Sequence, residues 1–391
     1  MFSAVPLRSP FTAIVPEKLY LAAPSVLFHS NNPPFLSLRC CVSSKCLANQ
    51  HSFTISYLMD SCGLSPETAS SASEKVHFET PERPDSVVTL LRNYGFSETH
   101  ISNLVRRRPS LLLANPEQTL LPKLEFFVSI GIPKPVLART LSSNPTLLTR
   151  SLEKQIIPSY NFLISIVRSN YKVASAMKRT TWIFLEDYAK NLEPNIGVLR
   201  EIGVRESCIS LLVTHFPEAL VQKNELFCEI VDEVQRMGFD PLKSTFVLAV
   251  HALSGKGNKL IRDRCYETYT RWGWTEDDIL LAFRKHPHCM ILSEKKITRA
   301  MDYFVNKMGW PAGLFARCPV VLFLSLEKRI IPRCSVIRIL LSKDLIKKEV
   351  SLSSVLLPVE RLFLKRFVTK YEEEVPQLFS VYQGKTDVLE V

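Results

Sequence analysis

The sequence predicts an all-α protein, a right-handed α-solenoid of about eight repeats, and a register of glycines is the first observation behind this. Six of the twelve glycines lie 35 or 36 residues apart, or twice that distance where one is missing. Self-similarity at this period is typical of a solenoid. Glycine suits the end of a helix, because it enters the left-handed conformation there without steric cost. The six are Gly95, Gly131, Gly203, Gly238, Gly273 and Gly309.

Prolines in the same register are the second observation. Five of them follow a register glycine by ten to fourteen residues and precede short apolar runs such as PSLLL, PTLLT and PVVLF. These turn prolines are Pro109, Pro145, Pro217, Pro287 and Pro319. Thirteen residues further on stand Pro122, Pro158 and Pro332, with Pro194 at the same distance from Thr181. The register glycines, the turn prolines and the prolines thirteen residues later all recur with the same period, which indicates one repeated structural unit.

Residues 95–131 show the plan of that unit. Ser97 is a suitable N-cap for a first amphipathic helix. This helix ends before Pro109, since the residue that precedes a proline is disfavoured in the α conformation, and the PSLLL run then predicts a tight helical turn. Asn115 caps a second helix, and Pro116 takes its first position. Two helices cannot bury their apolar stripes alone, so neighbouring units must stack.

Two units depart from the plan and keep the period. Around 167–203 the turn reads TTWIF, in which Thr181 replaces the proline and Trp182 is expected to fill the apolar slot. The unit 238–273 has HALSGKG where the others have a proline turn. No useful strand-like alternation is present. The sequence therefore predicts one elongated domain over residues 60–391.

Residues 1–59 have a different composition and are expected to be an organelle transit peptide or disordered leader. They contain Arg8, Lys18, Arg39 and Lys45 against the single acidic Glu17, and they are rich in Ser, Pro and Leu. Basic, hydroxylated and acid-poor N-termini are typical of transit peptides. A secretory signal is disfavoured, because no compact apolar region with a small-residue cleavage site follows the first basic residues. This composition does not separate mitochondrion from chloroplast.

No motif for catalysis, a cofactor or a metal stands out, so an enzyme is not expected. The sequence has no GxxxxGK, GxSxG or HExxH motif, and its carboxylates form no recognisable acid and base pair. None of the ten cysteines forms a CxxC pair, and Cys208, Cys228 and Cys289 are predicted to be small core residues. The HPHC segment that ends at Cys289 lacks a second ligand cluster. No run of eighteen uncharged apolar residues predicts a membrane span.

Positive charge, in contrast, follows the repeat. Formal net charge is +11, and removing the four basic residues and one acidic residue of the leader leaves +8. Two residues before each turn proline or its equivalent lies the first basic column, formed by Arg107, Ser143, Arg179, His215, Lys285 and Arg317. The second basic column lies nine residues after each turn proline or its equivalent and is formed by Gln118, Lys154, Lys190, Leu226, Lys296 and Lys328. The eight cations in these columns are the candidate nucleic-acid-binding residues, because stacked repeats align a column into a stripe that matches a phosphate backbone.

Two other interpretations of the same residues stay open. Lysine and arginine also solubilise an exposed face, and the arginines before Pro109 complement the dipole of the helix that they end. Trp182, Trp272, Trp274 and Trp310 are candidates for stacking on bases, although the last two follow register glycines, where packing is the simpler role.

The repeated turns resemble those of the mitochondrial transcription termination factor (mTERF) family, in its plant branch. The resemblance covers about residues 53–391 and is carried by RRRPSLLL, SSNPTLL, THFPEAL, RKHPHCM and ARCPVVL, by LPKLEFF and IIPSYNF, and by FVTKYEEEVPQLFSVYQGK. It implies an mTERF-type repeat of helix, helix and short 3₁₀ turn, curved into a basic groove for nucleic acid. It also implies an organellar protein, and the SFTISYL and SCGLSPE segments favour the mitochondrion over the chloroplast. The departures at Thr181 and in 238–273 weaken the expectation of contacts there.

Two functional hypotheses follow. One is a regulator of organellar transcription or its termination that binds double-stranded DNA. The other is an RNA-binding or scaffolding factor in intron splicing or ribosome assembly. Both imply nucleic acid as the partner, a monomer, and neither a cofactor, a small-molecule substrate nor a membrane. Single-strand binding requires exposed aromatic side chains beside the charge, and Trp182, Tyr188 and Phe216 are the aromatic residues near the columns.

Overall fold

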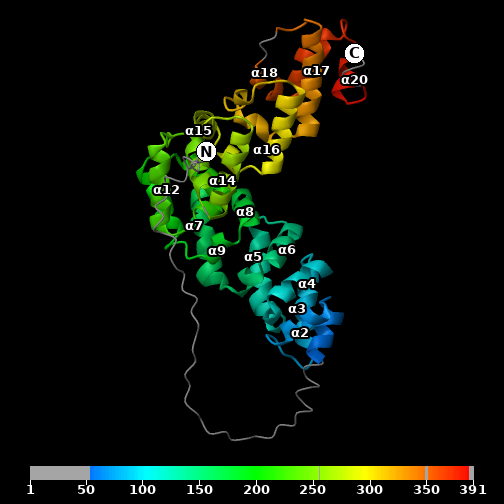
Figure 1. Cartoon of the computed structure of the whole chain (residues 1–391). Helices are drawn as coiled ribbons and strands as arrows, with labels where there is room; N and C mark the ends of the chain where they lie inside the picture. Colours follow the sequence, from blue (N-terminus) through cyan, green and yellow to red (C-terminus); the bar gives the residue numbers. More distant parts are fainter. Residues whose placement is uncertain (1–52, 255, 348–350, 387–391) are drawn as a thin grey trace, which may run out of the picture. The chain divides into compact units, whose positions relative to one another are not determined.

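The computed structural model describes residues 53–254, 256–347 and 351–386, and this part of the chain is helical with no strand (Figure 1). Repeated helices joined by short turns confirm the predicted all-α solenoid. Of the predicted leader, residues 1–52 lie outside the described part.

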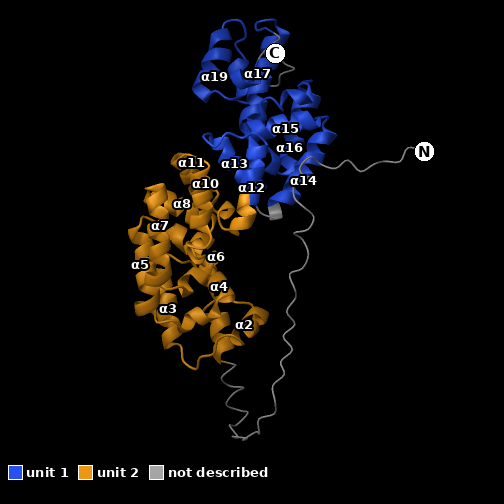
Figure 2. Cartoon of the chain, turned by 90° about the vertical axis from the view of Figure 1, so that its left-hand side faces the viewer, with its two compact units in different colours: residues 1–17, 229–391 blue, residues 18–228 orange. Residues whose placement is uncertain are grey.

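The described residues fall into two compact units, which are unit 2 up to Cys228 and unit 1 from Glu229 onward (Figure 2). Each unit carries the repeat by itself. A single continuous superhelix over 60–391 stays a prediction.

The described part of unit 2 begins with a helix over residues 53–60 and continues through four turn segments. Its further elements are α2 (Pro66–Ser73), α3 (Glu82–Asn93), α4 (Glu98–Arg107), η2 (Pro109–Leu113), η3 (Pro116–Leu120), α5 (Leu121–Ser129), α6 (Lys134–Ser143), η4 (Pro145–Thr149), η5 (Leu152–Ile156), α7 (Ile157–Val167), α8 (Asn170–Arg179), α9 (Trp182–Leu185), α10 (Leu192–Glu201), α11 (Glu206–His215) and η6 (Pro217–Ala219). Helix α12 (Asn224–Arg236) begins in unit 2 and ends in unit 1.

Unit 1 repeats the pattern of helices and turn segments. Its further elements are α13 (Ser244–Leu253), α14 (Lys256–Arg271), α15 (Glu276–Lys285), η7 (Pro287–Ile291), α16 (Glu294–Met301), η8 (Asp302–Lys307), η9 (Ala312–Leu314), η10 (Pro319–Phe323), η11 (Leu326–Ile330), α17 (Ile331–Ser342), α18 (Leu352–Leu356), α19 (Glu360–Phe367), η12 (Thr369–Tyr371) and α20 (Leu378–Tyr382).

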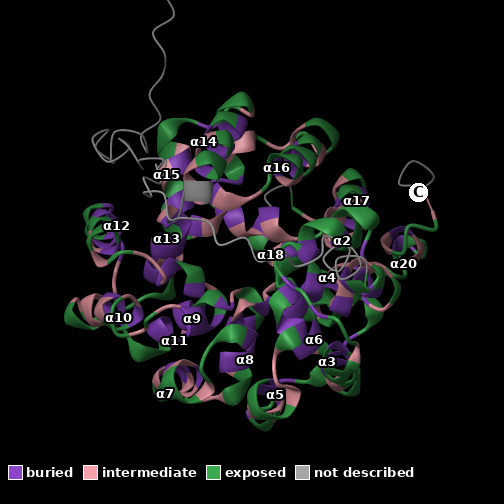
Figure 3. Ribbon diagram, turned by 90° about the horizontal axis from the view of Figure 1, so that it is seen from below, coloured by how far each residue is buried: buried purple, intermediate pink, exposed green. Residues whose placement is uncertain are grey.

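The repeats of unit 2 stack in two rows (Figure 3). The first helices of successive repeats, α4, α6, α8 and α11, contact one another in order, and the second helices α5, α7 and α10 each pack on the first helix that follows. Buried leucine, isoleucine, valine and phenylalanine side chains fill the space between the rows. In unit 1, the first helix α13 packs on the next first helix, α15, and the second helix α14 packs on the next second helix, α16.

Folded structure begins before the predicted leader boundary at residue 59. In the helix over 53–60, Thr54 and Leu58 are fully buried. The Thr54 hydroxyl donates to the carbonyl of Phe78 at 2.8 Å, and the Tyr57 hydroxyl donates to Asp85 at 2.7 Å. This helix therefore packs on the first repeats, so residues 53–59 belong to the folded unit.

Left-handed backbone recurs at every register glycine. All six have φ between 67° and 89°. In the repeat without the glycine, Arg168 ends α7 with φ 52°, and about one period after Gly309, Asp344 also has φ 52°. Two L-residues thus adopt a conformation that costs them about 1–2 kcal/mol. The stacking of the repeats imposes this turn even where the sequence lacks glycine.

Replacing Arg168 with glycine is therefore expected to raise the free energy of unfolding by about 1 kcal/mol, because the left-handed strain disappears while the unfolded chain gains some entropy. Urea denaturation measures the change. Gly131→Ala is the matched control one repeat earlier. It should cost about 1 kcal/mol through its φ of 89° alone, since a Cβ there meets no atom within 4 Å. A loss of stability in Arg168→Gly would contradict this account.

Second helices begin with a wide π turn that the sequence analysis did not predict. The amide of Leu121 bonds to the carbonyl of Pro116, five residues back, and Ile157 and Ile331 make the same bond in their repeats. Each is followed by a proline, Pro122 in the first case. Proline lacks an amide hydrogen and crowds the carbonyl four residues earlier, so the preceding turn widens. Where Ala300 replaces this proline, α16 starts as an ordinary α-helix.

Two local predictions were wrong. Trp182 does not fill the apolar slot of its turn. It is 54% exposed, and Ile183 and Phe184 are the fully buried residues of α9. The repeat that follows Gly309 has the single 3₁₀ turn η9 in place of a first helix. Its turn proline comes ten residues after the glycine instead of fourteen, which leaves too few residues for that helix.

Candidate nucleic-acid interface

Turn segments of successive repeats lie next to one another within each unit. In unit 2, α9 contacts both η4 and η6. In unit 1, η10 contacts η7 on one side and α18 on the other. Residues at one register position are therefore spatial neighbours inside a unit, as a column model requires. We call these two sets of segments the turn rows.

In unit 2 the first basic column is exposed but interrupted. Arg107 and Arg179 are the last residues of α4 and α8, and Ser143 stands between them in the register. The Arg179 guanidinium lies over the ring of Phe216 at 5.6 Å. Cations at the C-terminal end of a helix also complement its dipole, so part of their role is local.

In unit 1 the first basic column is continuous. Lys285 is the last residue of α15, and its ammonium donates to the carbonyl of Arg317 in the next repeat at 2.8 Å. Both side chains are exposed. Arg317 lies in a turn and not at a helix end, because this repeat lacks its first helix. The helix dipole therefore does not account for Arg317.

The second basic column occupies the third position of the second helix in three repeats. The backbone amides of Lys154, Lys296 and Lys328 donate to the capping serines Ser151, Ser293 and Ser325 at 3.1, 3.3 and 3.2 Å. A cation in the first turn of a helix is unfavourable to the dipole, where an anion is favoured. Lysines there do not stabilise their own helices, and this argues for a role toward an external anion.

The lysines of the second basic column differ in solvent exposure and in the partners of their ammonium groups. Lys154 and Lys328 are exposed. Lys190, also exposed, lies 3.8 Å from Asp187. Lys296 is half-buried, and its ammonium donates to the carbonyl of Phe323 in the next repeat at 2.8 Å. Two N–H groups of Lys296 stay available for another acceptor.

Polar side chains next to this column hold the repeats together, and the sequence analysis missed them. Gln155 donates to the carbonyl of Leu185 at 2.6 Å, and buried Asn195 donates to that of Leu220 at 2.9 Å. Lys123, also buried, donates to the carbonyl of Leu148 at 2.5 Å, and burial lowers the pKa of this lysine. Each acceptor ends a turn of the following repeat, where carbonyls lack helical partners. A polar residue at ten or fourteen positions past the turn proline is the signal that identifies them.

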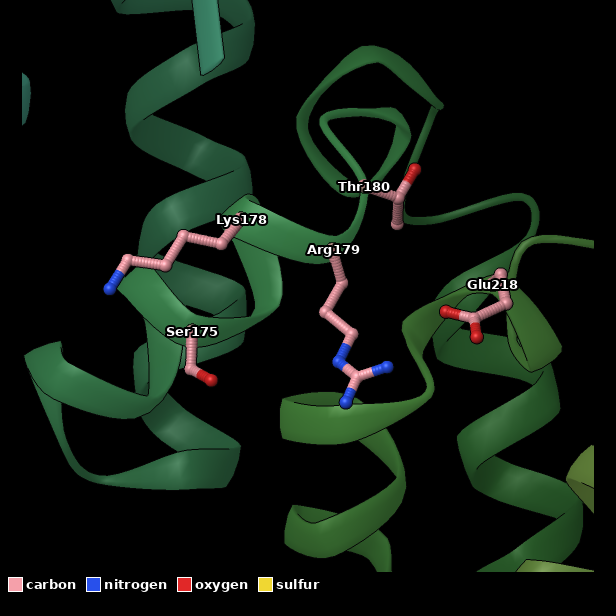
Figure 4. A pocket seen from close by; sticks show the side chains of 5 residues that line it. All are labelled: Ser175, Lys178, Arg179, Thr180 and Glu218. Carbon is pink, nitrogen blue, oxygen red and sulfur yellow. The ribbon is translucent and has the colours of Figure 1, made fainter. Parts of the chain in front are cut away.

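A polar pocket of about 660 Å³ opens at the end of α8 (Figure 4). It is lined by Ser175, Lys178, Arg179, Thr180 and Glu218. In Figure 4 the side chains of Arg179 and Glu218 extend toward one another, whereas Lys178 points to the opposite side. The pocket therefore has a cationic side and an acidic side.

The buried cysteines have unreactive thiols. Burial raises the pKa of the Cys62, Cys265 and Cys334 thiols to about 12, so they are protonated at neutral pH and pack as small apolar groups. Of the predicted core residues, Cys208 and Cys289 are buried and Cys228 is half-buried. Within the described ranges, no three His, Cys, Asp or Glu side chains gather where they could hold a metal ion. None of the helices described is both long and apolar enough to cross a bilayer.

Stacked helical repeats joined by short turns, with exposed cations beside those turns, define an α-solenoid. Within that class the chain belongs to the mTERF family, since the family model matches residues 88–253 and 253–364. A relative is "Transcription termination factor MTERF15, mitochondrial" of Arabidopsis thaliana, 22% identical over 321 residues that cover 81% of this chain. The chain spans 63% of the length of that relative.

Proposed function

We propose that this protein binds double-stranded DNA in the mitochondrion and acts in transcription or its termination. It does so as a monomer, without a catalytic step or a cofactor. The observation that carries the proposal is the set of exposed cations next to the turn rows, above all Lys154 and Lys328 of the second basic column, which their own helices do not favour. Repeated cations suit a repeating phosphate backbone and give affinity that does not depend on sequence.

The leader composition favours an organelle, and the name of the Arabidopsis relative, a mitochondrial protein, favours the mitochondrion. We propose that the leader ends before residue 53, since the helix over 53–60 is part of the fold. The alternative compartment is the chloroplast.

RNA binding is the second candidate function, and one observation favours it. Trp182 exposes a large aromatic surface on the turn row of unit 2, as single-strand binding requires. A role in intron splicing or ribosome assembly would use such binding.

Competition between nucleic acids tests the proposal. Full-length protein is titrated into a labelled blunt duplex at several salt concentrations. We expect log affinity to fall linearly with log salt, with a slope near −4 for about four to five phosphate contacts. Unlabelled duplex should displace the label at lower concentration than single-stranded RNA of equal length. Displacement by the RNA at lower concentration would favour the second candidate.

A further inference from the structure

Two lysines of one repeat in unit 1 are anchored on the turn η10 of the next repeat. The Lys285 ammonium donates to the carbonyl of Arg317, two residues before η10 begins, at 2.8 Å. The Lys296 ammonium donates to the carbonyl of Phe323, the last residue of η10, also at 2.8 Å. Both lysines belong to the basic columns, and an ammonium that makes one such bond has two further N–H groups for a phosphate oxygen. The position of η10 therefore decides where both charges lie.

An aromatic contact holds η10 against the repeat that carries these lysines. The ring of His286, the residue directly after Lys285, lies on the ring of Phe323, with 4.4 Å between the centroids and 35° between the planes. Phe323 is thus the stacking partner of His286 and also the acceptor of Lys296. The stacking of His286 therefore acts on the turn to which both lysines are bonded.

His286 packs as a flat ring and does not act as a charge. Its Nδ1 atom is buried and has no hydrogen-bond partner in the described part of the chain. Burial lowers the pKa of His286, so the imidazole is neutral at neutral pH. A neutral ring adds no charge to the first basic column, and its effect on binding is expected to pass through the residues on which it packs.

The same register position also joins repeats in unit 2. Directly before their turn prolines, Arg108 donates to the Thr146 hydroxyl at 3.3 Å and Asn144 donates to the Thr181 hydroxyl at 2.5 Å, in each case in the following repeat. Arg108 and Asn144 end their helices with φ of −144° and −140°, and His286 does so with φ of −151°. The residue between the first basic column and the turn proline thus reaches the next repeat in both units.

We infer that His286 is a positioning residue for nucleic-acid binding, because its stacking on Phe323 fixes the turn that holds Lys285 and Lys296 in place for phosphates. The inference rests on the proposed function, namely that the chain binds double-stranded DNA. A side chain that is anchored before binding loses less conformational entropy when it meets its ligand. His286 therefore raises duplex affinity without touching the duplex.

His286→Ala removes the ring, and His286→Phe is the matched variant that keeps a ring for stacking. Binding of the full-length protein to a labelled blunt duplex is measured at several salt concentrations. We expect His286→Ala to bind about 5- to 100-fold more weakly at roughly 0.1 M salt, the cost of ordering two long side chains, and His286→Phe to bind within about twofold of the wild type. The salt slope of His286→Ala should stay within about half a unit of the wild type, because the phosphate contacts still form.

A double-mutant cycle separates positioning from a general structural role. Joint replacement of Lys285 and Lys296 with alanine should flatten the salt slope by about 1.8, the share of two phosphates. In that background His286→Ala should weaken binding by less than about twofold, because no lysine is left to position. Tyr269→Phe is the stability control. It removes a buried bond to the carbonyl of Cys289 at 2.9 Å, so it should lower the melting temperature and leave duplex affinity within about twofold.

An unchanged duplex affinity in His286→Ala overturns the inference. So does an equal loss with and without the two lysines, and so does a loss in His286→Phe as large as that in His286→Ala. In these cases duplex binding by the wild-type protein leaves the proposed function standing. A wild-type protein that binds no duplex at low salt overturns the proposed function and this inference with it.

Discussion

Replacing Lys285, Arg317 and Lys328 together with alanine is expected to weaken duplex binding by about two orders of magnitude at roughly 0.1 M salt. The three side chains are exposed and belong to two consecutive repeats of unit 1, and the Lys285 ammonium donates to the backbone carbonyl of Arg317. Each lost phosphate contact releases one counterion fewer, so the slope of log affinity against log salt should flatten by about two to three units. The loss should be the same for all duplex sequences, because phosphate contacts carry no sequence information.

A control variant with the same loss of net charge tests whether the position of the three cations matters. Lys307, Lys343 and Lys347 are also exposed lysines of unit 1, and all three lie outside the two basic columns. Their joint replacement with alanine removes the same net charge and should change the slope by less than about one unit. Equal losses from the two triple variants would show that affinity follows net charge and that the columns are a solvated face. A loss confined to one sequence would instead indicate base readout by Arg317.

The second large effect is expected at Arg333, which holds the last repeat of unit 1 together. This side chain is 2% exposed, and its Nη1 lies 2.9 Å from the carbonyl of Val355 and 2.8 Å from that of Pro358. The guanidinium also lies over the ring of Phe363 at 4.7 Å. Burial lowers the pKa of Arg333. Arg333→Met should lower the free energy of unfolding by about 3 kcal/mol, because the carbonyl of Val355 loses its donor and the contact of the guanidinium with the Phe363 ring is lost, whereas the carbonyl of Pro358 still accepts from Arg329 at 2.6 Å.

Thermal unfolding followed by circular dichroism measures this loss, and about 6–12 °C is expected for a unit of this size. Arg338→Met is the control on the same helix, since Arg338 is exposed, and it should change stability by less than about 0.5 kcal/mol. Arg333→Lys keeps the charge but loses the planar fork, so an intermediate loss is expected. A melting temperature for Arg333→Met that matches the control would show that the carbonyl of Val355 finds another donor.

Much of the fold follows from local signals in the sequence. The left-handed glycines, the Ser97 and Asn115 caps and the proline turns were predicted at the positions where they occur. Each depends on interactions within about four residues, so a single repeat contains the information. The π turns were missed, although the proline that causes each one was identified. The sequence pattern marks the proline but does not show that the helix widens before it instead of breaking.

The sequence predicted which register positions carry the cations of the candidate interface. It did not predict which of those cations are exposed and which are bonded to the next repeat. Lys296 and Lys328 share a column, yet Lys296 is half-buried and donates to Phe323, 27 residues further on, whereas Lys328 is exposed. Trp182 was expected to be buried in the core and is exposed to solvent instead, because Ile183 and Phe184 occupy the core in its place. These outcomes depend on what the next repeat offers, which no local pattern encodes.

The sequence by itself therefore determined the repeat, its period, the ends of its helices and the family to which the chain belongs. Only the tertiary structure decided which cations are free for a ligand, which polar side chains join the repeats and which aromatic side chain is exposed. The physical reason is the range of the interactions. Caps and left-handed turns act within one repeat, whereas burial and side-chain hydrogen bonds join residues some 25–38 positions apart, as between Asn144 and Thr181.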